Sequence, residues 1–371
     1  MFCFNRFRQK GQLDGAALVA PAARSEKIRS PMPRFPVLDG WRGISILAVL
    51  ACHMLPLGPR SWRLNEAVGL LGMSLFFTLS GFLITKTLIH DPSIRNFSIR
   101  RFFRIIPLAW LFAVLVLPLV KAPAADYGVT LLFLANLPPY HLTPLTGHYW
   151  SLCVEVQFYA FVAVLFWLAG NRGLITLVVI GLLVTGNRMM HGVGAAISTP
   201  YRSDEIFSGA TLALVHSDYL GSIGRCLRRA LATASPAIIV APFLLACHPS
   251  VIIAEYFRPY LAAALVGTTL LHGGILTNWL QHRKLAYVGE ISYALYVIHP
   301  LSLRGWLGHG TTVIKYAKRP LCIAISFLAA HFSTRYYEKR WISLGRRLIA
   351  RTPSGVESGK ELRSTPIYST S

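Results

Sequence analysis

Long apolar stretches, separated by short clusters of basic residues, run through almost the whole chain and restrict its fold more than any other feature. Of the 371 residues, 54% are hydrophobic and only 14% are charged, whereas about a quarter of the residues in soluble domains carry charge. An apolar stretch of about 20 residues can cross a bilayer as a helix. We therefore expect an all-α polytopic membrane protein with about ten spans. The stretches are 42–57, 67–89, 103–120, 149–169, 173–187, 204–217, 230–247, 258–279, 286–307 and 320–337.

The basic residues indicate how these spans are oriented. The net charge of +22 would also fit a nucleic-acid-binding protein. Ten spans, however, bring five basic clusters to one side, as the positive-inside rule requires of a cytoplasmic face, and no recognition module for nucleic acid accompanies them. We expect both termini in the cytoplasm, contact with anionic membrane lipids and no nucleic-acid partner. Lys315, Lys318 and Arg319 are the exception, because this topology places them outside.

The polar ends of the chain are expected to flank one membrane domain. Residues 1–34 are basic and residues 346–371 are rich in Ser, Thr and Gly, so we expect two disordered tails around a transmembrane domain at 35–345. The first segment lacks the apolar core of a signal peptide, and either Met1 or Met32 can be the start. The six cysteines form no CxxC pair, so we expect neither a disulfide framework nor a metal site.

Two ionisable residues in the first apolar stretch are the first candidates for function. Arg42 and His53 are eleven residues apart, which on a helix is almost three turns, so both lie on one stripe about 16 Å apart. We expect Arg42 at the membrane surface and His53 at mid-depth in the bilayer. Burying such groups is costly without a partner or a water-filled cavity, which makes them functional candidates.

A cluster of arginines precedes the third apolar stretch. Arg100, Arg101 and Arg104 are spaced by one turn of a helix and are expected on one cytoplasmic face. Such a cluster can simply set topology and contact lipid headgroups. Because guanidinium forks match phosphate with two hydrogen bonds, a nucleotide phosphate is the alternative ligand.

The fourth stretch carries a polar face. Ser151, Glu155 and Tyr159 are four residues apart and share one side of a helix. Trp150 fits an interfacial belt residue. Glu155 enters the apolar region without a neighbouring cation, and the expected topology places it toward the periplasm.

The second and ninth stretches contain further small or polar residues. Ser80-Gly81 in the second fits a close contact between helices. In the ninth, Ser292, Tyr296 and His299 form one polar stripe. A buried His beside a Tyr is often only a structural hydrogen bond, and lining of a pocket is the alternative. After the last span, Glu338 can pair with neighbouring basic residues.

Five segments, taken in order, resemble acyltransferase family 3, the integral-membrane acyltransferases that modify O-antigen, exopolysaccharide and Nod factor. They are LDGWRG followed by His53, GMSLFFTLSGFLI, RRFFRIIP, WSLCVEVQFY and GEISYALYVIHP. Each segment is weak alone, but the five in this order cover about residues 35–345. The resemblance implies an O-acyltransferase of the bacterial inner membrane. It would transfer an acyl group, most often acetyl, from cytoplasmic acyl-CoA to a hydroxyl of a saccharide or glycolipid.

The resemblance also assigns roles. His53 is then the catalytic base, with Arg42 and Glu155 in the catalytic group, and the cluster Arg100, Arg101 and Arg104 binds acyl-CoA. The residues expected to contact substrate are Asp39, Trp150, Tyr159, Ser292, Tyr296, His299 and Glu338. Acyl-CoA is a co-substrate, and no permanently bound cofactor or metal is expected. Direct transfer and a covalent acyl-His intermediate both remain open. The alternative function is a proton-coupled transporter or flippase of a lipid-linked saccharide, for which inverted repeats would be the signal.

Overall fold

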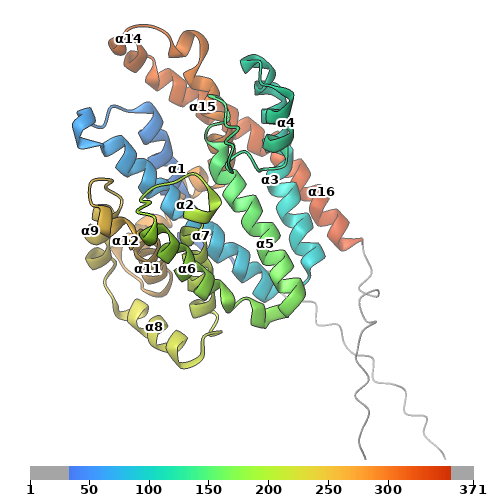
Figure 1. Ribbon diagram of the computed structural model, residues 1–371, viewed down its shortest axis with the longest axis vertical. Helices are drawn as coiled ribbons and strands as arrows, with labels where there is room; N and C mark the ends of the chain where they lie inside the picture. The colour runs from blue at the N-terminus through green and yellow to red at the C-terminus, as the bar shows by residue number, and fades with distance from the viewer. Residues whose placement is uncertain (1–32, 352–371) are drawn as a thin grey trace, which may run out of the picture. The chain divides into compact units, whose positions relative to one another are not determined.

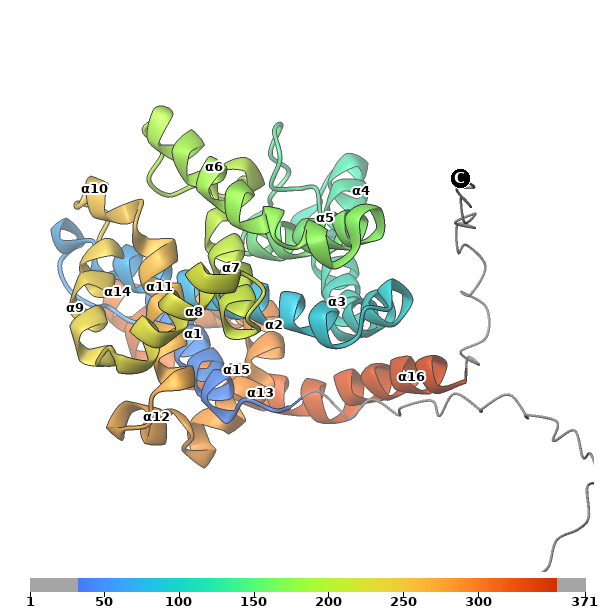
Figure 2. The same ribbon diagram turned by 90° about the horizontal axis from the view of Figure 1, so that it is seen from below.

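The computed structural model describes residues 33–351, and this part of the chain is helical, without a β-strand (Figures 1 and 2). The helices longer than ten residues are α1 (Pro36–Met54), α2 (Leu64–His90), α3 (Ile94–Val116), α5 (Tyr149–Gly173), α6 (Thr176–Met190), α7 (Asp204–His216), α8 (Gly221–Thr233), α9 (Pro236–Ala246), α11 (Arg258–Leu271), α13 (Arg283–Ile298), α15 (Arg319–Phe332) and α16 (Lys339–Ala350).

Shorter elements connect these helices. They are α4 (Ala124–Leu131), α10 (Ile252–Glu255), α12 (Ile275–Leu280), α14 (Thr312–Ala317), the 3₁₀ turns η1 (Arg60–Trp62), η2 (Pro118–Val120), η3 (Thr199–Tyr201), η4 (Leu301–Leu303) and η5 (Gly305–Gly308), and the π-helical turn η6 (Ser333–Glu338).

Four helices in the described region are long and apolar enough to cross a membrane. They are α1, α2, α5, and α3 extended through η2, and the bent pair α8–α9 can add a fifth. The other expected spans contain helices of only 13 to 16 residues, such as α7 and α13. At 1.5 Å per residue these reach roughly 20–24 Å, which is short of a hydrocarbon core of about 30 Å. Ten full-length spans and two cytoplasmic termini therefore stay predictions.

Proline and glycine shorten the later helices. The expected span 230–247 is bent by 100° where α8 ends and α9 begins at Pro236. The span expected at 258–279 ends at Leu271 and is followed by Gly273 and Gly274. Proline cannot continue a preceding helix and glycine disfavours one. Broken helices of this kind are tolerated where they pack within protein.

The tails lie mostly outside the described residues. This applies to 1–32 and 352–371, so the expected disorder stays a prediction. Helix α16 continues to Ala350, past the boundary expected at residue 345.

Helix α1 lies at the centre of the packing. It contacts α2 on one side and α13 on another, and α2 packs in turn against α7. Helix α3 contacts α5 and α16, which Figure 1 shows beside it. The core contains side chains from these helices, including the fully buried Phe77, Leu152 and Ala294.

Two glycines allow α2 and α7 to approach closely. A Cβ added to Gly81 would collide with the backbone oxygen of Ile206, and one added to Gly209 would collide with that of Thr78. The interpretation of Gly81 as a small-residue helix contact is therefore confirmed.

We predict that Gly81→Ala and Gly209→Ala each destabilise the protein by about 1–3 kcal/mol, because overpacking forces the two backbones apart. Gly186→Ala in α6 is the matched control, since its Cβ would meet nothing within 4 Å and alanine favours a helix by up to about 1 kcal/mol. Thermal unfolding in detergent measures the three variants. Equal unfolding temperatures for all three would contradict the close contact.

Candidate active site

A cavity lined by arginine side chains lies between α1, α2, α3, α5 and α13. It encloses about 750 Å³, including the part that is open to solvent. Apolar and aromatic side chains form most of its wall. The charged residues in the lining are Arg42, Arg101, Arg104 and Glu155, and the serines are Ser45, Ser80 and Ser292. We call this space the arginine cavity.

The arginines reach this cavity from two distant parts of the sequence. Arg42 extends from the second turn of α1, and Arg101 and Arg104 extend from one face of α3. No hydrogen bond or ion pair joins Arg42 or Arg104 to another side chain within residues 33–351. Their N–H groups are therefore available to an anionic ligand, for which guanidinium is well suited.

Arg101 is held more firmly than the other two arginines. It donates a hydrogen bond to Thr87 Oγ1 at 3.2 Å. Its guanidinium lies 5.4 Å from the ring centroid of Tyr159, within range of a cation–π interaction. Tyr159 was expected to contact substrate, and in the structure it also packs against the guanidinium of Arg101.

Glu155 shares the arginine cavity. Its Oε1 accepts hydrogen bonds from Ser80 Oγ at 2.6 Å and from Tyr159 OH at 2.5 Å, but no ion pair joins it to an arginine of the described region. Three guanidinium groups thus face one carboxylate, and the cavity is positively charged. The expected topology put Glu155 and these arginines toward opposite sides of the membrane, whereas the structure brings them to one cavity between contacting helices α3 and α5. The side of the membrane on which this cavity opens stays a prediction.

Arg100 does not join the cavity. It forms an ion pair of 2.7 Å with Asp91 near the beginning of α3, and both side chains are partly exposed. Arg101 and Arg104 lie on the face of α3 that lines the cavity, and Arg100 lies on a different face of the same helix. Of the three arginines in the expected phosphate cluster, only two are brought together.

A second cavity of about 1200 Å³ contains three histidines. His53 comes from the last turn of α1, His148 from the residue before α5, and His299 from the end of α13. The ring centroids of His53 and His299 are 5.3 Å apart, and those of His148 and His299 are 5.5 Å apart. We call this space the histidine cavity.

Backbone carbonyls fix the hydrogen-bonding roles of two of these rings. His299 Nδ1 lies 2.8 Å from the carbonyl oxygen of Tyr296, and His148 Nε2 lies 3.2 Å from that of Val297. A carbonyl only accepts, so these nitrogens are the donors, and the other nitrogen of each neutral ring is an acceptor. Within residues 33–351, the His53 ring makes no hydrogen bond to a backbone carbonyl, and it is more exposed than the other two rings. It is therefore the histidine of the cluster that is free to exchange a proton with a ligand.

The two cavities adjoin each other. Val49, Met73 and Tyr296 line both. Tyr296 OH donates to the backbone oxygen of His148 at 2.6 Å and contacts Ser151 Oγ at 2.5 Å. The tyrosine thus lies at the junction and also holds the loop that carries His148.

His53 lies nearer the end of its helix than expected. Helix α1 begins six residues before the expected start and ends at Met54, one residue after His53. The chain leaves the helix because Leu55 precedes Pro56, and a residue before proline disfavours the helical conformation. Arg42 and His53 remain about 16 Å apart along α1, one in each cavity.

The remaining expected residues fall in different places. Ser292 lines the arginine cavity and Trp150 lines the histidine cavity. Asp39 instead forms an ion pair with Arg34 at 2.8 Å. Glu338 is buried and accepts a hydrogen bond from Thr334 at 2.7 Å, with no ion pair to the basic residues around it.

Sequence reasoning missed His148 as a site residue. It precedes Tyr149 and Trp150, and such a group at a span end fits an interfacial belt. Its neighbours His53 and His299 are about a hundred residues or more away in the sequence, so no local spacing connects them.

We predict that Glu155→Gln strengthens the binding of an anion in the arginine cavity several-fold, because it removes the one opposing charge there. Inorganic pyrophosphate is the probe, and titration calorimetry on the purified protein is the measurement. Tyr159→Phe is the control, since it removes a hydrogen bond to Glu155 but keeps the carboxylate. Weaker pyrophosphate binding in Glu155→Gln would contradict this charge arrangement.

Comparison with known proteins identifies the family to which this chain is similar. The family model described as an acyltransferase domain matches residues 35–312. The chain is 25% identical to the peptidoglycan O-acetyltransferase OatA of Listeria monocytogenes over 357 residues, which cover 82% of this chain and 55% of the relative. It is 27% identical to the putative peptidoglycan O-acetyltransferase YrhL of Bacillus subtilis, over 71% of this chain and 48% of the relative.

The chain thus spans about half the length of these curated relatives. A putative O-acetyltransferase of Staphylococcus aureus is 29% identical over a shorter segment, 36% of this chain and 25% of the relative. No solved structure matches. Because the family model covers most of the chain, including both cavities, the protein belongs to acyltransferase family 3.

Proposed function

We propose that the protein transfers an acetyl group from acetyl-CoA to a hydroxyl of a saccharide. The observation that carries this proposal is the pair of adjoining cavities, one lined by arginines and the other by histidines. The first is suited to holding an anionic donor and the second to moving a proton. The names of the relatives specify peptidoglycan, so a peptidoglycan glycan strand is the first acceptor to test.

The donor's phosphates would lie against the arginines. Arg42 and Arg104 have unpaired guanidinium groups, and Arg101 retains a buried Nε without a partner. Each fork can donate two hydrogen bonds to a phosphate. The acyl arm would then extend past Tyr296 into the histidine cavity. Acyl-CoA acts here as a co-substrate that leaves after each turnover.

The chemical step would take place at His53. Its neutral imidazole accepts the proton of the acceptor hydroxyl as the oxygen attacks the thioester carbonyl. A C–O bond forms, the C–S bond breaks, and the proton passes to the departing thiolate to give free CoA. The acceptor nitrogens of His148 and His299 can stabilise the imidazolium while it holds the proton.

The tetrahedral oxyanion also needs a donor. Tyr296 OH already donates to a backbone oxygen, whereas Arg42 has free N–H groups but lies about 16 Å away along α1. The donor would then be a backbone N–H outside α1, because the N–H groups at the end of this helix are already bonded, as that of Leu55 is to Ala51. A covalent acyl-His53 intermediate followed by attack of the hydroxyl is the alternative route.

The location proposed for this reaction is the bacterial inner membrane. The apolar helices α1, α2, α3 and α5 support a membrane setting. The arginine cavity would face the cytoplasm, where acyl-CoA is made, and the histidine cavity would open toward the other side. An acetyl group could then reach a saccharide that has already been exported, and both chain termini would be cytoplasmic.

We predict that His53→Ala and His53→Gln lower acetyl transfer by about 10²–10⁴-fold, the usual contribution of a general base. Glutamine can hydrogen-bond but cannot take the proton. His309→Gln is the matched control, because His309 is exposed in a loop outside both cavities. The measurement is transfer of radiolabel from acetyl-CoA to glycan strands by purified protein in nanodiscs. Transfer at the wild-type rate by folded His53→Ala protein would remove His53 from the mechanism.

We predict that the double variant Arg101→Ala, Arg104→Ala binds acetyl-CoA at least about tenfold more weakly, since hydrogen bonds to charged groups contribute about 1.5–3 kcal/mol each. Arg100→Ala is the matched control on the same helix, because Arg100 pairs with Asp91 outside the cavity. Titration calorimetry measures both. Equal weakening by the control, or none by the double variant, would place the donor elsewhere.

A further inference from the structure

A third cavity of about 1040 Å³ opens beside the histidine cavity. Trp150 and Met73 line both spaces. The loop between α6 and α7 forms much of its wall, and Tyr140, Tyr201 and Arg202 complete its polar and aromatic lining. We call this space the side cavity.

Arg202 is the unusual residue of the side cavity. It is only 1% exposed, and within residues 33–351 none of its three side-chain nitrogens has a hydrogen-bond partner. Its guanidinium lies 5.4 Å from the ring centroid of Trp150. Glu205 Oε2 is 3.3 Å from Arg202 Nη2, which makes an ion pair without hydrogen-bond geometry. Leaving buried donors unsatisfied is costly, so these N–H groups point to a ligand.

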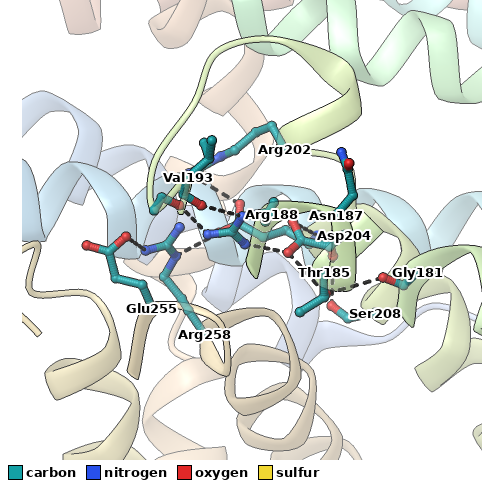
Figure 3. A network of polar contacts seen from close by, with 12 residues as sticks. Gly181, Thr185, Asn187, Arg188, Val193, Arg202, Asp204, Ser208, Glu255 and Arg258 are labelled. Carbon is teal, nitrogen blue, oxygen red and sulfur yellow. Dashed lines mark hydrogen bonds and ion pairs between the residues drawn. The ribbon is translucent and has the colours of Figure 1, made fainter. Parts of the chain in front are cut away.

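A buried charge network lies next to Arg202 and anchors the loop that leads to it. Arg188 forms an ion pair with Asp204 and donates to the backbone oxygens of Val193 and Gly194. Figure 3 shows how this network connects the loop between α6 and α7 to the beginning of α7. The network fixes the loop that forms the wall of the side cavity.

The partner of Arg202 is itself shared. Glu205 Oε1 accepts a hydrogen bond from Arg258 Nε at 2.8 Å, and both side chains are fully buried. Glu205 is therefore bound more tightly to Arg258 than to Arg202. Arg202 thus keeps buried N–H donors without a hydrogen-bond partner in the described part of the chain, and the residue lines the side cavity.

We propose that the side cavity binds one sugar ring of the acceptor, with Arg202 donating hydrogen bonds to the ring's oxygen atoms. This inference rests on the proposed acetyl transfer. Ligand sites typically combine apolar and aromatic walls with a few fixed polar groups, and Trp150, Tyr140, Tyr201 and Arg202 supply that combination. Because Trp150 and Met73 line both the side cavity and the histidine cavity, a sugar held against Trp150 would lie next to the space that contains His53.

Steady-state kinetics with soluble peptidoglycan glycan strands and acetyl-CoA test the assignment. In nanodiscs, Arg202→Lys should raise the KM for the strands at least tenfold, since a point charge replaces a planar fork. The KM for acetyl-CoA and the kcat should change less than twofold. Ala196→Trp, which fills the side cavity from its loop wall and leaves the charge network intact, should have the same effect.

Met190→Trp is the matched control, because Met190 is 80% exposed at the end of α6 and lines none of the three cavities. It should keep all three kinetic constants. Transfer by the wild-type protein with an unchanged KM for the strands in both Arg202→Lys and Ala196→Trp would overturn the acceptor subsite alone. No transfer to the strands by the wild-type protein would contradict the proposed function instead, and the subsite would fall with it.

Discussion

The site depends on guanidinium groups held inside an apolar helical bundle. A buried charge is tolerated only with a partner, a water-filled space or a ligand. The protein meets this requirement in two ways. Arg188 and Arg258 are paired with carboxylates, whereas Arg42 and Arg104 face a cavity in which Glu155 is the one carboxylate. The paired arginines stabilise the fold, and the unpaired arginines are available to the anionic donor that we propose.

Helix α1 connects the arginine cavity to the histidine cavity. It passes along both cavities, with Arg42 in the first and His53 in the second. Its close packing against α2 and α13 brings Met73 and Tyr296 to the junction between them. The proposed donor, acyl-CoA, would suit this arrangement, because its phosphates and its thioester are far apart. In the proposed mechanism, the separation of about 16 Å along α1 keeps the donor-binding charge of Arg42 away from proton transfer at His53.

Helical periodicity in the sequence predicted several of the residues that line the cavities. It failed where the position of a side chain depends on tertiary packing. Eleven residues of helix place Arg42 and His53 on one stripe whatever the surroundings, and the same geometry explains Arg101 and Arg104. Periodicity could not predict that Arg100 forms an ion pair with Asp91, or that Glu155 lines the same cavity as the arginines. His148 was missed because His53 and His299 are remote in sequence, and Arg202 was missed because its place beside Trp150 depends on tertiary packing. Hydropathy also does not register the bend of 100° between α8 and α9, so it could not show that the stretch 230–247 is broken at Pro236.

A structure of the protein in a lipid nanodisc, bound to a non-hydrolysable thioether analogue of acetyl-CoA, would test the central claim most directly. The account predicts phosphate oxygens within hydrogen-bonding distance of at least two of Arg42, Arg101 and Arg104. It also predicts the acetyl carbonyl beyond Tyr296, in the histidine cavity beside His53. Phosphates bound elsewhere, or an acetyl end that stays in the arginine cavity away from His53, would contradict it.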